Sequence, residues 1–360
     1  MNRPAAPRIR PTGLSFAAGM IVMIAFFLLT LSLLSTILPR NELFEAIGPQ
    51  PGEHVLTLAQ SATGGLFAGS GQGRVWERRG AAWETVGERD DEAATGITAL
   101  LAEPQLVAGG ADGAWRWNAA AAQWQRLEDG LPEMYRVSAL LAEADGAVLL
   151  ATDQGLYRSE AELTQWQRLP DEGLPESATL YRLYQDGDGR LYAATIGHGL
   201  YRLQGAHWQS DSDGLPPASN LFDLIELPDG RQVVATEHGP FQRSGDASWQ
   251  PLGEAMAGKR VLTLALSSDQ GPPLLWAGSD DGLHRLLLEG DGHDWQHAAR
   301  LAAQVSALSS HEGRLFVAAG HVYDYQSWPG LSGWHFFLTL IFSGLLFYAI
   351  SRHPRLARVA

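Results

Sequence analysis

The residues best suited to chemistry in this chain are histidines and carboxylates in glycine-containing turns. His198 and His238 occupy equivalent turns in neighbouring copies of a repeat, so they could share a metal ion or a ligand. A lone turn histidine is more often solvated, and we therefore predict no metal site and no cofactor. The sequence contains no Gly-x-Ser-x-Gly elbow, phosphate-binding loop or His-Glu-x-x-His pair, and we expect no catalytic residue and no enzyme activity.

Acidic turn residues form the second group of candidates. Five lie in tight turns between strands, and three others begin Asp/Glu-Gly-Leu-Pro segments whose leucines add apolar contacts. Asp and Gly are also ordinary turn formers, which is the competing interpretation for any single residue. Taken together, they predict an acidic binding face. Its candidate residues, with the two histidines, are Asp112, Asp129, Asp153, Glu172, Leu174, His198, Asp213, Leu215, Glu237, His238, Asp280 and Asp281.

Composition excludes several classes of function. The chain of 360 residues has 26 basic and 40 acidic residues and a formal charge of −14. All acidic residues lie between two apolar runs, whereas six arginines lie outside these runs, so the section between them carries 20 basic and 40 acidic residues. This balance argues against nucleic-acid binding, which needs a basic face. Because cysteine is absent, disulfides and thiolate metal sites are excluded.

The two apolar runs predict membrane helices. Residues 14–38 and 331–350 are uncharged and long enough to span a bilayer. The first has no small-x-small cleavage site, so we interpret it as an uncleaved signal anchor. Arginines flank the outer ends of both, which predicts cytoplasmic tails at 1–13 and 351–360 and a domain at 41–327 outside the cytoplasm. Many arginines and a single lysine are typical of a GC-rich bacterium, so we expect the inner membrane and the periplasm.

The middle of the chain is a repeat of about 40 residues. Seven short apolar strands begin 40 to 44 residues apart, at Val55, Ile97, Val137, Leu180, Leu221, Val261 and Val305. Each is followed by turn signals and further short strands, which is typical of the blades of a β-propeller. A tryptophan lies in the fourth strand of six units, where we expect it to pack between blades. We predict an all-β, seven-bladed propeller.

The last unit lacks its own fourth strand. The segment Asn41–Gly48 resembles the tryptophan-bearing strand of the first unit, with Phe44 in the place of Trp83. We therefore predict that this N-terminal segment closes the last blade. Closure removes the exposed edges that an open array of sheets would present.

Three linkers read Asp129-Gly-Leu-Pro, Glu172-Gly-Leu-Pro and Asp213-Gly-Leu-Pro. With the following strand, Asp-Gly turn, Ala-Thr and Gly-Leu-Tyr, they resemble the two-component-regulator propeller repeat of bacterial sensor ectodomains. The fullest match is one blade, from Gly173 to Arg202. The ten residues after Ile350 are too few for a kinase or a DNA-binding domain, which departs from the sensor architecture. Membrane-associated propellers of the photosystem assembly-factor type are similar in fold and bind other proteins.

Three functions follow as hypotheses. The leading one is a membrane-anchored periplasmic scaffold, assembly factor or accessory subunit that binds a membrane or periplasmic protein complex on its acidic face. The alternative is a sensor ectodomain that binds a small ligand or glycan and signals through partner proteins. A propeller lyase or glycosidase is the third, and it would need an acid, a base and a cation-binding group over the channel.

Overall fold

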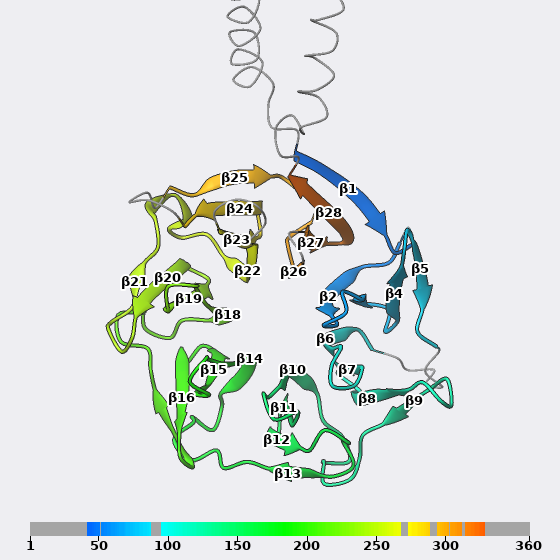
Figure 1. The fold of residues 1–360 in the computed structure, drawn as a ribbon. Helices are drawn as coiled ribbons and strands as arrows, with labels where there is room; N and C mark the ends of the chain where they lie inside the picture. The colour runs from blue at the N-terminus through cyan, green and yellow to red at the C-terminus, as the bar shows by residue number, and fades with distance from the viewer. Residues whose placement is uncertain are drawn as a thin grey trace, which may run out of the picture. The chain divides into compact units, whose positions relative to one another are not determined.

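The computed structural model describes residues 42–50, 52–87, 95–267, 273–288, 294–301, 303–311 and 314–327. The predicted membrane helices at 14–38 and 331–350 lie outside these ranges, as do both tails. Within these ranges no helix is long and apolar enough to span a bilayer. The described strands form seven four-stranded sheets, arranged as a ring of blades around a central channel (Figure 1). The predicted seven-bladed propeller is confirmed.

Blades 1 to 6 are antiparallel meanders that run from the channel outwards, whereas blade 7 takes its outer strand from β1. The blades are numbered by their inner strands. The inner strands are β2 (Val55–Gln60), β6 (Ile97–Leu101), β10 (Val137–Ala142), β14 (Thr179–Gln185), β18 (Leu221–Glu226), β22 (Val261–Ser267) and β26 (Ala307–His311). The second strands are β3 (Leu66–Ser70), β7 (Val107–Gly110), β11 (Val148–Thr152), β15 (Leu191–Ile196), β19 (Arg231–Thr236), β23 (Leu274–Ser279) and β27 (Arg314–Ala319).

The outer half of each blade has two more strands. The third strands are β4 (Val75–Arg79), β8 (Gly113–Asn118), β12 (Gly155–Ser159), β16 (Leu200–Gln204), β20 (Gly239–Ser244), β24 (Gly282–Leu287) and β28 (His321–Ser327). The fourth strands are β5 (Ala82–Thr85), β9 (Gln123–Arg126), β13 (Trp166–Arg168), β17 (His207–Ser210), β21 (Gln250–Pro251), β25 (Gln296–Ala299) and, in blade 7, β1 (Glu42–Gly48). A short 3-10 turn covers Glu254–Met256.

The predicted blade starts agree with the inner strands to within two residues. The largest difference is in blade 7, where β26 begins at Ala307 rather than at Val305. Trp249 and Trp295 lie one residue before their outer strands, β21 and β25, rather than inside them. These two strands are short or shifted, yet both tryptophans remain buried.

The Ala-Thr and Gly-Leu-Tyr parts of the repeat build the turn between the second and third strands. A hydroxyl at the end of the second strand donates to the carbonyl of the glycine that begins the third. Thr152 does so to Gly155 at 2.9 Å, and Thr236 to Gly239 at 2.7 Å. Both glycines have a positive φ, a backbone conformation that favours glycine. The motif therefore closes a two-residue turn in these two blades; in blade 4 Thr195 closes a three-residue turn in the same way, on Gly199 O at 2.7 Å.

Tryptophan side chains join each blade to the one before it. In five blades the indole N–H donates to a backbone carbonyl of the preceding blade. The accepting residue lies in the outer strand of that blade or just after it. The donors and acceptors are Trp83 to Ile47 (2.7 Å), Trp124 to Val86 (2.6 Å), Trp208 to Pro170 (3.2 Å), Trp249 to Asp211 (2.9 Å) and Trp295 to Leu252 (2.7 Å). The nitrogen of Trp166 is buried without such a partner among the described residues. The predicted role in inter-blade packing is confirmed.

The ring is closed between blade 7 and blade 1. Strand β1 pairs with β28, which confirms that the N-terminal segment supplies the missing outer strand. At the inner edge, the amide of Val55 donates to Gly320 O at 2.9 Å, and Ser306 Oγ donates to Val55 O at 3.2 Å. Val55 also shares one apolar cluster with Phe316 of blade 7, against which Ile47 packs. Backbone hydrogen bonds and apolar burial thus hold both sides of the closure.

Candidate functional site: the linker face and the central channel

Linkers between blades and turns between second and third strands lie on one face, as the alternation of strand direction requires. We call it the linker face. Most of the predicted acidic turn residues on this face form hydrogen bonds within the protein. Asp153 Oδ1 accepts the backbone amide of Arg136 at 2.8 Å, and Glu237 accepts both the backbone amide and the side-chain amide of Asn220. In both cases the carboxylate holds the residue that directly precedes the inner strand of the same blade.

The turn acids of blades 2 and 6 make similar contacts. Asp112 Oδ1 accepts the hydroxyl of Thr95 at 2.7 Å. Asp281 accepts from Lys259 Nζ, from Ser279 Oγ at 2.6 Å and from His284 Nε2 at 2.8 Å. Burial alone would raise the pKa of Asp281, but these hydrogen bonds hold it well below its usual range. The neighbouring Asp280 is exposed.

The Asp/Glu-Gly-Leu-Pro linkers are joints between blades. The carbonyls of Asp129, Glu172 and Asp213 accept the amides of Trp166, Trp208 and Trp249 of the next blade at 2.9, 2.7 and 2.8 Å. The following glycine lies so close to that tryptophan that a Cβ on Gly173 would be 2.0 Å from Trp208 O.

The predicted leucines and linker carboxylates differ in exposure. Leu174 and Leu215 are half-buried and pack on the apolar clusters of their blades, so they belong in part to the core. The side chains of Asp129 and Glu172 are exposed, whereas the carboxylate of Asp213 accepts a hydrogen bond from Ser248. The linker face thus presents fewer free acids than the sequence indicates.

The two candidate histidines are not brought together. His198 Nε2 lies 3.2 Å from Ser177 Oγ, and His238 Nε2 lies 3.6 Å from Glu237 Oε1. Each contacts a side chain of its own blade. Among the residues with described side chains, no group of three or more His, Asp or Glu is placed to hold a metal ion.

A hollow opens on the linker face over blades 2 and 3. It has a volume of about 430 Å³ and lies between the turn before β8 and the linker that leads to β10. Its lining residues are Ala111, Asp112, Trp115, Arg126, Glu133, Met134 and Tyr135. We call it the Met134 hollow, because the Met134 side chain is 78% exposed.

The backbone around the Met134 hollow is fixed. Met134 O accepts a hydrogen bond from Gln154, and Arg126 donates to Glu133 O at 3.0 Å. The buried hydroxyl of Tyr135 accepts from Ala114 N at 3.1 Å and donates to Leu127 O at 2.7 Å. Burial raises the pKa of Tyr135 to about 12. A methionine on a fixed backbone beside a hollow is a suitable apolar contact for a partner.

The central channel holds a larger cavity of about 550 Å³. Inner strands of all seven blades line it, and Ala111 lines both this cavity and the Met134 hollow, so the two adjoin. In six blades the register of the inner strand shifts near its start, at the second residue in five of them and at the third in β14, as in a β-bulge. The bulged residues are Leu56, Thr98, Ser138, Tyr181, Phe222 and Leu262, and all six line the cavity.

Charge in the channel is concentrated on blades 3 to 5. Arg136, Arg182 and Asp223 are the charged residues among those lining the cavity. Asp223 is buried, and its oxygens accept the amides of Leu224 at 3.0 Å and Leu264 at 2.9 Å. Arg182 Nε also donates to it at 3.2 Å. This carboxylate is therefore held by three donors in a fixed position.

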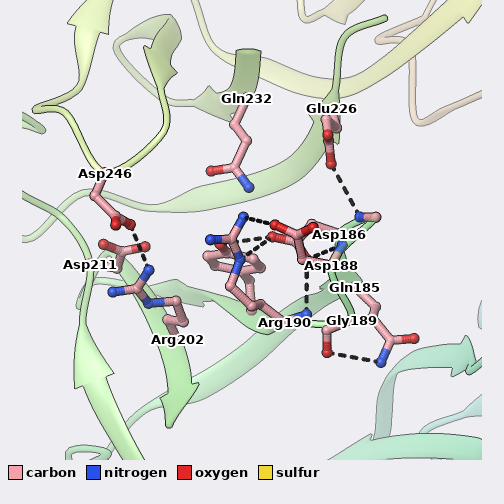
Figure 2. Close-up of polar contacts among 12 residues, drawn as sticks. Gln185, Asp186, Asp188, Gly189, Arg190, Arg202, Asp211, Glu226, Gln232 and Asp246 are labelled. Carbon is pink, nitrogen blue, oxygen red and sulfur yellow. Dashed lines mark hydrogen bonds and ion pairs between the residues drawn. The ribbon is translucent and has the colours of Figure 1, made fainter. Parts of the chain in front are cut away.

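A separate polar cluster lies at the turn between β14 and β15, on the face opposite the linker face. Figure 2 shows Asp186 next to Arg190, with Glu226 of the next blade reaching the same turn. The buried carboxylate of Asp186 accepts Arg190 Nε at 2.7 Å, Tyr192 Oη at 3.1 Å and two backbone amides. Glu226 accepts the amide of Gly187 at 3.3 Å. The hydrogen-bond donors and acceptors of this cluster are paired with one another. We therefore assign it a structural role, which is to hold blades 4 and 5 together.

Comparisons with known proteins support the fold. No protein-family model matches the sequence, and no curated protein matches it. The extracellular domain of a protein assigned as a one-component system of B. thetaiotaomicron superposes with a TM-score of 0.67 at 20% identity, over 80% of this chain and 40% of that chain. This chain therefore spans less than half the length of that relative. The protein is structurally similar to such sensor ectodomains, as its repeat motif predicts.

Two shorter propellers match over nearly their whole length. YCF48 bound to D1 peptide has a TM-score of 0.61 at 15% identity, over 78% of this chain and 96% of that chain. A catalytically inactive virginiamycin B lyase from Staphylococcus aureus with quinupristin has a TM-score of 0.64 at 9% identity, over 79% and 98%. At these identities the likeness concerns the fold alone. The structurally similar proteins include a sensor, a peptide-binding protein and an enzyme. The fold therefore does not identify the function, which depends on the site.

Apart from Asp112, which lines the Met134 hollow, sequence reasoning did not find the residues of the two hollows. Met134 and Tyr135 follow a Gly-Leu-Pro linker and resemble ordinary turn residues. The channel residues carry a weak signal, since Tyr181 and Phe222 stand where blades 2 and 3 have Thr98 and Ser138. A large aromatic residue at a position that faces away from the blade core indicates a different role for blades 4 and 5.

Proposed function

We propose that the chain is a non-catalytic propeller, anchored to the bacterial inner membrane and facing the periplasm, that holds a partner protein on its linker face. The observation that carries the proposal is the Met134 hollow, where an exposed methionine lies beside a cavity of about 430 Å³. A single exposed methionine is common on protein surfaces, so the weight lies on its place beside this cavity, on a backbone that Gln154 and Arg126 hold. The role would be that of a scaffold, assembly factor or accessory subunit.

The charge of the linker face supports a protein partner. Asp129 and Glu172 present exposed carboxylates on the linkers next to the Met134 hollow and in the following blade. A polar, charged rim around an apolar centre is the usual composition of a protein-binding surface. The structure of YCF48 bound to D1 peptide gives an example of a propeller of this size that binds a peptide.

A second candidate is supported by the channel. A sensor ectodomain that binds a small ligand would need an enclosed cavity, and the central cavity of about 550 Å³ is within the range of ligand sites. The similarity to the ectodomain of a one-component system favours the same candidate. In either case signalling or assembly would require a partner chain in the membrane.

The test is capture from membranes with matched variants. The full-length chain, extracted from its own membranes in mild detergent, is expected to retain a protein partner. Met134→Asp is expected to reduce the amount of that partner at least about tenfold, because it places a charge in an apolar contact. Leu287→Asp is the control, since Leu287 is 45% exposed but lies on β24, away from the hollow. Equal capture by all three proteins would contradict the proposal.

A further inference from the structure

Two parts of the channel wall, which also includes leucines, Thr57, Thr263 and Gln304, differ in chemistry. On blades 2, 3 and 7 the inner strand, or the residue just before it, presents a hydroxyl whose hydrogen is already donated to a backbone carbonyl. Thr98 donates to Val137 O at 3.1 Å, Ser138 to Ala151 O at 3.2 Å and Ser306 to Val55 O at 3.2 Å. These hydroxyls bind strands to one another, so they offer no further donor to a ligand.

The other part of the wall is aromatic. On blades 4 and 5 the equivalent positions hold Tyr181 and Phe222, whose ring centroids lie 5.5 Å apart at an interplanar angle of 81°. Tyr181 is 40% exposed, although it lines the cavity. An edge-to-face pair with one ring open to a cavity can accept a third flat ring against it.

Two arginines line the same cavity as these rings. Asp223 engages only Nε of Arg182, so the two terminal nitrogens of Arg182 form no hydrogen bond with the described part of the chain. Arg136 lines the same cavity, and its guanidinium has no ion pair with any residue that the structure describes. With one carboxylate against two arginines, the channel carries a net positive charge in a chain whose formal charge is −14.

We propose that the central channel binds a small aromatic carboxylate, with its ring against Tyr181 and Phe222 and its carboxylate on Arg182 and Arg136. The terminal nitrogens of an arginine match a carboxylate in a two-bond geometry. A sugar acid has the same charge but many hydroxyls, and the hydroxyls of Thr98, Ser138 and Ser306 could only accept hydrogen bonds from them, because their own hydrogens are already donated. The chemistry of the wall therefore favours a flat apolar ring.

This site does not depend on the partner proposed for the linker face. The ligand would lie inside the channel, whereas the partner would cover Met134 outside it. The two claims can therefore fail separately: Met134→Asp should leave ligand binding unchanged, and the arginine variants should leave partner capture unchanged.

The test compares phenylacetate with phenylacetamide, which has the same ring and no charge, by titration calorimetry on the full-length protein. Phenylacetate is expected to bind at least about ten times more tightly than phenylacetamide, and also more tightly than glucuronate. Arg136→Gln and Arg182→Gln are each expected to weaken phenylacetate binding at least about tenfold. Arg79→Gln removes the same charge from β4, where Arg79 pairs with Glu77 and Glu84, and should have no effect.

Arg182→Gln also removes a donor from the buried Asp223, so its melting temperature is measured alongside. Arg136→Gln has no such complication, because the described hydrogen bonds of Arg136, both with Asp153, are made by its backbone. The proposal is overturned if phenylacetate and phenylacetamide bind equally, if glucuronate binds more tightly than phenylacetate, or if Arg136→Gln binds as the wild type does. Absence of saturable phenylacetate binding up to about 10 mM would overturn it as well.

Discussion

The indole nitrogen of Trp83 donates a hydrogen bond of 2.7 Å to the carbonyl of Ile47, which lies in the N-terminal strand β1. Trp83 belongs to blade 1, whereas β1 is the outer strand of blade 7. The bond is the same joint that Trp124 makes with Val86 between blades 1 and 2. The N-terminal strand therefore holds the place that a fourth strand holds in every other blade, and the ring is continuous through it.

Replacing Glu42–Gly48 by a Gly/Ser linker of equal length should open this joint. The outer edge of β28 would lose its partner strand, and Trp83 would lose its acceptor. We expect the apparent melting temperature of the full-length protein to fall by about 10 °C in a thermal scan. An unchanged melting temperature would show that blade 7 does not need the N-terminal strand.

The contribution of the indole hydrogen bond to stability can be measured by comparing substitutions of two tryptophans. Trp124→Phe leaves the carbonyl of Val86 without its donor, whereas the nitrogen of Trp166 has no acceptor in the described structure. Both changes remove a similar volume from a buried site. Trp124→Phe is therefore expected to reduce the free energy of unfolding by about 1–2 kcal/mol more than Trp166→Phe does. If the two variants have equal free energies of chemical unfolding, these tryptophans stabilise the protein by packing alone.

The glycine of the Gly-Leu-Pro motif should not tolerate alanine. Gly173 has a φ of +92° and lies against Trp208 O, whereas Gly205 has a φ of +63° and nothing near its missing Cβ. Gly205→Ala thus measures the cost of the backbone conformation, about 1–2 kcal/mol. Gly173→Ala adds a clash with the next blade and should cost clearly more in equilibrium unfolding. Equal losses in the two variants would contradict the inter-blade role of the motif.

Stability should fall on mild acidification because of His284. Burial lowers the pKa of this imidazole, although the hydrogen bond to Asp281 acts in the opposite direction. Below the ordinary histidine pKa of about 6.5, the unfolded chain binds a proton that the folded chain does not, so stability is lost as the pH falls through that window. The lowered pKa of Asp281 adds a further loss only at lower pH, below about 3.9.

The measurement is chemical unfolding of the wild type and His284→Gln at about pH 7 and pH 5. The variant should lose less stability between the two values than the wild type does. His238→Gln, at a half-exposed turn position, is the control and should keep the wild-type slope. If His284→Gln loses as much stability as the wild type between the two pH values, His284 does not contribute to the pH dependence.

The repeat fold was predictable because each blade carries the same local signals. Strand starts, Ala-Thr turns and tryptophans recur at a period near 40, and the missing strand of blade 7 could be matched to Asn41–Gly48 by its similarity to the first blade. The linker face was also predictable from strand alternation. The direction of its side chains was not: Asp153 and Glu237 are acidic turn residues by type, but they bind the backbone of their own blades.

The channel was hidden from sequence reasoning for a geometric reason. A bulge in the inner strand decides that Tyr181 and Arg182 both reach the cavity, and no residue pattern marks such a bulge. The cavity residues Arg136, Arg182, Tyr181 and Phe222 come from three neighbouring blades and line one cavity only when these blades pack side by side.

Site-specific photo-crosslinking in intact cells would detect a partner protein bound over Met134. A photoreactive amino acid placed at Met134 of the full-length chain should give a discrete crosslinked product with one other protein, and the same amino acid at Leu287 should not. A product of equal yield at both positions, or none at Met134, would contradict the account.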